Sequence, residues 1–236
     1  MRLKVSTLLI WTISIGSIVL ALKASDERMP SVLRDTWVDS LFQQFGTGNS
    51  IIFSLSIGFL ISVFFYLLIA WYPNRQRKNL IKRNFQEQYL SFKHDTICIF
   101  LGASEKVYDG ALPSKLSDQT EFRKFFEQPD KNEPRNIKWY AVLNGLNEYH
   151  LKQLLVELEI FMNEVAYVLN NVEINDPDVF SFLKRLSQTV YMYKNSTLEY
   201  VEVKRLSGFL WQLFAGWNPI DGYLEDDIVK VMIQKI

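Results

Sequence analysis

Few residues of the kinds that build enzyme and metal sites occur in this chain of 236 residues. There is one cysteine, Cys98, and there are two histidines, His94 and His150. A single cysteine excludes a disulfide within the chain and is consistent with a reducing compartment. His94 and Cys98 stand four residues apart and could share a helix face, but two ligands do not make a zinc site. We therefore expect no metal centre.

Motifs that bind phosphate or activate a nucleophile are also missing. Gly102, Gly110 and Gly145 stand alone instead of forming a phosphate-binding loop, and no serine lies in a G-x-S-x-G sequence. The run Glu225–Asp227 is interpreted as the acidic first turn of a helix, where the helix dipole favours negative charge. We expect no cofactor and no catalytic residue. An enzyme with an unrecognised site is kept as a third hypothesis.

Charge is absent from two long apolar segments near the N-terminus. Val5–Leu22 has 18 residues and Ile51–Trp71 has 21, and neither contains Asp, Glu, Lys, Arg or His. About 20 helical residues cross the hydrocarbon core of a bilayer. The sequence thus predicts transmembrane helices at about 5–22 and 51–71. The first run also resembles a cleaved signal peptide, but it is long for one and lacks a good cleavage site.

Basic residues set the expected orientation of this hairpin. Arg2 and Lys4 precede the first helix, and five basic residues with no acidic one follow the second: Arg75, Arg77, Lys78, Lys82 and Arg83. Positive flanks stay in the cytoplasm, so both termini are expected there. The five positives are interpreted as contacts for anionic lipid headgroups. The alternative is a docking strip for an acidic partner, including nucleic acid.

Small residues occur at helical spacing in both apolar segments. Ser54, Gly58 and Ser62 share one face of the second, and Thr12 and Gly16 form a shorter stripe in the first. Small residues let membrane helices approach closely. The stripes either pack the two helices against each other or drive self-association into an oligomer or pore. Neither segment carries an ionisable residue, which argues against a transporter.

The connection between the two segments contains a third helical pattern. Apolar residues recur every four positions from Leu33 to Phe45, after Pro30. This predicts an amphipathic helix at about 31–45 on the outer membrane surface. The helix either anchors the hairpin or perturbs the bilayer.

The rest of the chain is expected to be helical. Pro73 should end or kink the second membrane helix, and a basic juxtamembrane helix is predicted over 73–94. A mostly α-helical cytoplasmic domain follows at 95–236, with a loop-rich stretch at 102–135. From residue 84 onward there are 16 basic and 22 acidic residues, a net charge of −6. This part is therefore not expected to bind nucleic acid directly.

Local signals place the helices of this domain. Apolar spacing predicts a helix from Leu151 to Leu169, and shorter ones at 119–128 and 136–144. Asp176-Pro177 is a helix start, and Ser196 with Glu199 forms a capping box. A turn is expected at 218–222 and a last helix over Leu224–Lys235. Thr96–Leu101 is the one candidate strand.

An aromatic cluster lies near the C-terminus. Trp211, Trp217 and Tyr223 fall within a short stretch before the last helix. They either fill the core or edge a partner-binding groove, because aromatic residues are enriched at interaction hot spots.

The layout resembles the two-transmembrane effector proteins of bacterial anti-phage systems, in particular those of some retrons. The resemblance covers the hairpin, the basic exit at Arg75–Arg83 and the helical domain with its Leu151–Asn170 helix. It implies a toxin that is held silent by a reverse transcriptase with its RNA–DNA hybrid and damages the inner membrane when released. The net charge favours contact with the protein of that complex over its nucleic acid. A non-toxic membrane tether or assembly subunit is the alternative hypothesis.

Overall fold

The computed structural model describes residues 2–26, 45–105, 107–130 and 133–236. The chain is mostly helical, with 76% of its residues in helices. It divides into two compact units, Met1–Arg77 and Lys78–Ile236. The amphipathic helix expected at about 31–45 falls almost wholly outside the described residues.

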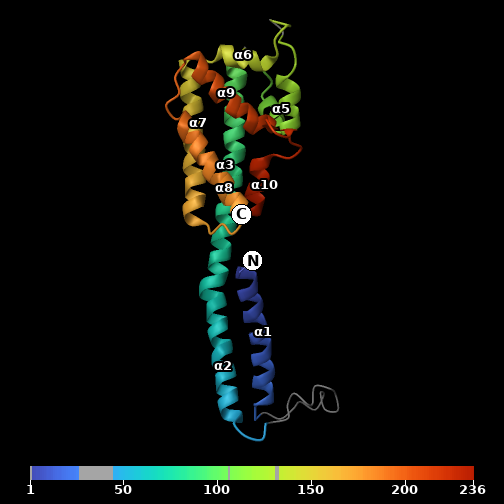
Figure 1. Cartoon of the computed structure of the whole chain (residues 1–236), viewed down its shortest axis with the longest axis vertical. Helices are drawn as coiled ribbons and strands as arrows, with labels where there is room; N and C mark the ends of the chain where they lie inside the picture. Colours follow the sequence, from blue (N-terminus) through green and yellow to red (C-terminus); the bar gives the residue numbers. More distant parts are fainter. Residues whose placement is uncertain (1, 27–44, 106, 131–132) are drawn as a thin grey trace. The chain divides into compact units, whose positions relative to one another are not determined.

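The first unit is a pair of helices. Helix α1 (Arg2–Lys23) packs beside α2 (Asn49–Tyr66), and the two run in opposite directions (Figure 1). In the described part of the chain, one continuous helix, Asn49–Ser104, is long and apolar enough to cross a membrane. The apolar stretch of α1, Leu8–Lys23, is shorter.

The helix does not end at Pro73. A π-helical turn, η3 (Leu67–Trp71), follows α2, and α3 (Tyr72–Ser104) continues directly from it. Proline lacks the amide hydrogen that the regular helical pattern needs, and the π turn changes that pattern just before it. Of the two outcomes expected at Pro73, an end or a kink, the end of the helix is therefore wrong. The candidate strand Thr96–Leu101 is also wrong, since it lies inside α3.

The second unit is an α-helical bundle built around α3. Its long helices are α7 (Glu148–Asn171), α8 (Pro177–Tyr193) and α9 (Tyr200–Ala215), and the chain closes with α10 (Ile228–Lys235). Three short helices connect α3 to α7: α4 (Leu112–Leu116), α5 (Gln119–Phe126) and α6 (Lys138–Gly145). A small antiparallel hairpin, β1 (Trp217–Asn218) and β2 (Gly222–Tyr223), follows α9 at the predicted turn.

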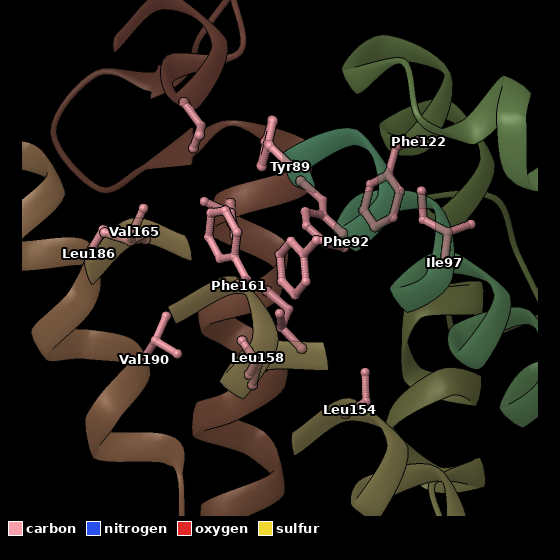
Figure 2. Close-up of a cluster of buried hydrophobic side chains, with 14 of the residues drawn as sticks. Tyr89, Phe92, Ile97, Phe122, Leu154, Leu158, Phe161, Val165, Leu186 and Val190 are labelled. Atoms are coloured by element: carbon pink, nitrogen blue, oxygen red, sulfur yellow. The ribbon is translucent and has the colours of Figure 1, made fainter. Parts of the chain in front are cut away.

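Aromatic side chains form the centre of this bundle (Figure 2). The Phe92 and Phe161 rings stack with centroids 4.6 Å apart, joining α3 to α7, and Phe214 of α9 meets Phe92 at 5.6 Å. Phe85 and Tyr89 also contact Phe161. One face of residues 78–94, which includes Phe85, Tyr89 and Phe92, therefore belongs to the core of the second unit. The predicted separate juxtamembrane helix at 73–94 is divided between the two units.

One predicted helix start is confirmed and one is wrong. Asp176 caps α8 by accepting a hydrogen bond from the Asp178 amide at 2.9 Å, with Pro177 in the first turn. Ser196 does not cap α9, because Glu199 is the N-cap of that helix, and the Ser196 amide bonds to the Tyr193 carbonyl at the end of α8. Instead α9 begins at Tyr200, and the Glu202 carboxylate accepts a hydrogen bond from the Thr197 hydroxyl at 2.8 Å.

Candidate functional site

A surface groove of about 710 Å³ lies between α3 and α7 in the second unit. The two helices run antiparallel along it. Asn84 donates a hydrogen bond to the Glu164 carboxylate at 2.9 Å, whereas further along α3, Gly102 lies close to His150 near the start of α7. Each helix contributes residues three and four positions apart, such as Asp95, Ile99 and Gly102 on α3. The groove therefore runs along two adjacent helix faces.

Two carboxylates line one end of the groove. Asp95 on α3 accepts one hydrogen bond from the Ser91 hydroxyl at 3.0 Å, and its other oxygen lies 3.1 Å from His94 Nδ1. Glu157 on α7 has no hydrogen-bond or ion-pair partner among the residues that the structure describes. Burial and the neighbouring charge of Asp95 raise the pKa of Glu157 above its ordinary value. This end of the groove is acidic.

The middle of the groove is apolar, and the end opposite the carboxylates carries polar groups. Ile99 and Val156 line its middle, and Tyr149 and Lys152 line it towards the start of α7. Val156 is 49% exposed and Tyr149 is 66% exposed, so both present apolar surface to solvent. Gly102 has no side chain to fill the space, and only His150 lies within 4 Å of where a Cβ would stand.

The two residues considered as metal ligands lie beside this groove. Cys98 Sγ is 3.9 Å from His94 Nδ1, so they share a helix face as their spacing predicts. Within the described ranges there is no group of three or more His, Cys, Asp or Glu that could hold a metal ion. Burial is the main factor that raises the pKa of the Cys98 thiol, which disfavours the nucleophilic thiolate.

A buried polar cluster joins α3 to α10, and sequence reasoning missed it. Lys93 Nζ lies 3.0 Å from Asp227 Oδ2, and the Tyr89 hydroxyl donates to the same carboxylate at 2.9 Å. Asp227 is thus the buried partner of Lys93. Because α10 begins at Ile228 instead of Leu224, the run Glu225–Asp227 precedes the helix and ends in its N-cap, rather than forming its first turn. Spacing along the chain gives no signal for a pair separated by 134 positions.

The basic residues predicted to meet lipid have several partners in the structure. In the second unit, Lys78 donates to the Glu173 carbonyl at 3.4 Å and Lys82 donates to the Gln234 carbonyl near the end of α10. Arg83 lies 3.8 Å from Glu87 on the protein surface. In the first unit, Arg75 lies over the Trp71 ring at 5.1 Å. Lys82 therefore helps to hold α10, whatever it contacts outside the protein.

The small residues singled out in the helical pair lie away from its contact. Ser54, Gly58 and Ser62 are exposed, and nothing lies within 4 Å of a Cβ placed on Gly58. Thr12 and Gly16 on α1 are exposed as well. The small residues that are buried in the pair are Ser56 on α2 and Ser14, Ser17, Ala21 and Ala24 on the other side of the contact. The predicted stripes therefore do not pack α1 against α2, and self-association stays a prediction.

The three aromatic residues near the C-terminus come together around Tyr223. Trp217 pairs with Tyr223 across the small hairpin, and the Trp211 side chain lies near enough to Tyr223 to lower its pKa slightly against the raising effect of burial. Trp211 is half-buried, with its ring 5.0 Å from that of Trp139, so it belongs to the edge of the core. Trp217 and Tyr223 are more exposed. Whether they contact a partner stays a prediction.

Comparison of this chain with protein-family models, with curated proteins and with solved structures found no match.

Proposed function

We propose that this protein is an inner-membrane effector of bacterial anti-phage defence, held silent by a cytoplasmic protein partner and damaging the membrane when released. In this proposal α1 and α2 are the two transmembrane helices and the second unit is cytoplasmic. The layout resembles that of two-transmembrane retron effectors, whose restraining partner would be a reverse transcriptase with its RNA–DNA hybrid.

The apolar outer surface of the helical pair supports a place in the membrane. Leu8, Leu55 and Ile69 are each more than two-thirds exposed in the structure, although all are large and apolar. Side chains of this kind are stable when lipid surrounds them. The positively charged exit from Arg75 onward supports a cytoplasmic second unit.

The observation that carries the effector role is the position of the small-residue face. Residues advance by about 100° around a helix, so Ser56, which contacts α1, lies on nearly the opposite side of α2 from Ser54 and Gly58. The face of Ser54, Gly58 and Ser62 points away from α1 and is free for close approach by another membrane helix. Lateral association through this face would assemble several hairpins into a membrane-damaging oligomer.

Membrane potential and growth of cells after induction of the full chain test this proposal. We expect depolarisation and growth arrest, and we expect Ser54→Leu combined with Gly58→Leu to abolish both. Phe53→Leu combined with Phe64→Leu is the matched control, since these exposed residues lie on a different side of α2. Toxicity that survives the Ser54 and Gly58 substitutions would show that the proposed face is wrong.

A non-toxic membrane tether is the second candidate, and the α3–α7 groove favours it because the groove suits binding rather than catalysis. Unchanged potential and growth at confirmed high expression, together with stable constitutive binding of one cytoplasmic protein, would support the tether. If the potential instead collapses only when that protein is removed, the effector proposal stands.

A further inference from the structure

We propose that the groove between α3 and α7 binds one amphipathic helix of a partner protein. The bound helix places a lysine or arginine beside Asp95 and Glu157 and an apolar side chain over Ile99 and Val156. This inference rests on the proposed function in one respect, because it names the surface through which a protein partner contacts the second unit.

The shape of the groove fits a helix. Two antiparallel helices that expose residues at three- and four-residue steps leave a channel between them, and a third helix can fill it with one face. Gly102 deepens this channel because it has no side chain. The exposed apolar groups of Tyr149 and Val156 stand along it, where a partner would remove them from water.

The charges of the groove select the chemistry of that helix. Glu157 lacks a neutralising partner among the described residues, and Asp95 is the nearby charge that most affects it. Among the residues that the structure describes, the partners of Asp95 are His94 and Ser91, and neither is a permanent cation. A lysine or arginine placed between the two carboxylates relieves their repulsion and gains charge-assisted hydrogen bonds.

The groove also has a direction. The carboxylates lie at one end, and Lys152 lines the groove nearer the start of α7, about one and a half helical turns from Glu157. A bound helix is therefore favoured with its basic residue at the Asp95 end and an acidic or neutral residue near Lys152. The same carboxylates repel phosphate, so neither nucleic acid nor an anionic lipid surface fits this groove.

A selection experiment with the full chain in lipid nanodiscs tests the proposal. The probe is a displayed library of helical peptides in which one face varies among Lys, Glu, Gln, Leu and Ala. We expect enrichment of peptides with Lys about one turn from Leu. Val156→Asp should lower that enrichment by about tenfold or more, equivalent to about 1.4 kcal/mol.

Matched controls lie on the same helix. Ile160 is 50% exposed and Val156 is 49% exposed, but Ile160 does not line the groove. Ile160→Asp should therefore leave the enriched motif unchanged. Glu159 pairs with Lys194 outside the groove, so Glu159→Lys should also leave it unchanged. Glu157→Lys should instead change the selected residue from Lys to Glu.

Four results would overturn the inference, three of them from the selection itself. The three selection results are a library without an enriched motif, a motif that Val156→Asp leaves intact, and the same basic motif selected by the Glu157→Lys protein. Disulfide formation between two copies of a Val156→Cys, Cys98→Ser variant would assign the groove to self-association and also overturn it. Binding does not depend on depolarisation, so failure of the effector proposal would be seen separately in the potential measurement.

Discussion

Lys93 and Asp227 form an ion pair of 3.0 Å in the interior of the second unit, where the Lys93 side chain is fully buried and that of Asp227 is 7% exposed. The same carboxylate accepts a hydrogen bond from the Tyr89 hydroxyl and, through Oδ1, from the Val229 amide at the start of α10. One side chain thus caps the last helix and ties it to α3. Burial lowers the pKa of Lys93, and it outweighs the opposite effect of the Asp227 carboxylate, which favours the protonated ammonium group.

Asp227→Ala should destabilise the second unit by about 3–5 kcal/mol, because it leaves the Lys93 charge buried without a partner. Asp227→Asn keeps an oxygen that can cap α10 and should cost less. Denaturant unfolding of the full chain in detergent, followed by tryptophan fluorescence, measures both. The matched control is Asp226→Ala, since Asp226 is exposed, and its effect should stay within about 0.5 kcal/mol. Equal losses at positions 226 and 227 would contradict the assignment.

Replacing both members of the pair distinguishes a buried charge from general packing. The double variant Lys93→Met, Asp227→Asn contains no unpaired buried charge. Its loss of stability should therefore be smaller than the sum of the losses measured for the two single variants. The interaction energy from this double-mutant cycle is expected to be about 1–3 kcal/mol. Purely additive losses would show that the pair contributes nothing beyond its separate contacts.

Tyr223 should titrate well above an ordinary tyrosine. Burial is the main factor, and its hydrogen bond to the Glu127 carboxylate adds to it, so the pKa is raised from 10.0 to about 12. Because the folded-state pKa lies above the unfolded value, this interaction stabilises the fold below pH 10, and the contribution is lost as the pH rises through about 12. The difference in tyrosinate absorbance between the protein and its Tyr223→Phe variant measures this titration.

Glu127→Gln provides the test of cause for Tyr223. It removes the negative charge beside the phenol but keeps an amide oxygen that can accept a hydrogen bond, so the pKa of Tyr223 should fall towards 10. Glu133→Gln changes a carboxylate that contacts Asn136 instead and should leave the titration of Tyr223 unchanged. A pKa that does not move in the Glu127 variant would assign the whole shift to burial.

Local patterns in the sequence were enough to find the long helices of the second unit. The Leu151–Leu169 stripe lies within α7, because its apolar spacing matches the turn of the helix that it forms. Asp176-Pro177 starts α8 for equally local reasons. The capping box at Ser196 and Glu199 failed because the Ser196 amide is already used at the end of α8. A four-residue motif does not show that the preceding helix already uses one of its backbone amides.

The groove and the buried pair could not be predicted in the same way. Asp95 and Glu157 come together only because α3 and α7 pack antiparallel through Phe92 and Phe161. Which face of α2 meets α1 was also open, because Ser54 and Ser56 are equally small and only packing selects between them. Sequence spacing defines a face of one helix, whereas the identity of its neighbour depends on the tertiary fold.

Gly145→Ala should destabilise the second unit strongly, whereas Gly208→Ala should stabilise it. A Cβ at Gly145 would overlap the Ala103 carbonyl, so α6 and α3 would have to separate, at a cost of about 1–3 kcal/mol. Gly208 lies inside α9 with nothing within 4 Å of an added Cβ, and replacing a helical glycine by alanine gains about 0.5–1 kcal/mol. Unfolding curves of the two variants measure these opposite shifts. Destabilisation by Gly208→Ala would show that α9 packs more tightly there.

Large side chains at Ser17 and Ala21 should separate α1 from α2. Both residues are less than a tenth exposed in the contact, and overpacking there should cost about 1–3 kcal/mol. Ser14 and Val63 line one small cavity between the helices, so cysteines at these positions in a Cys98→Ser background report on the contact. Ser17→Leu with Ala21→Leu should reduce their cross-linking in membranes. Gly16→Leu is the matched control, because a Cβ at Gly16 meets nothing within 4 Å, and it should leave the cross-link intact. Loss of the cross-link in the Gly16 variant would show that α1 meets α2 through the predicted stripe.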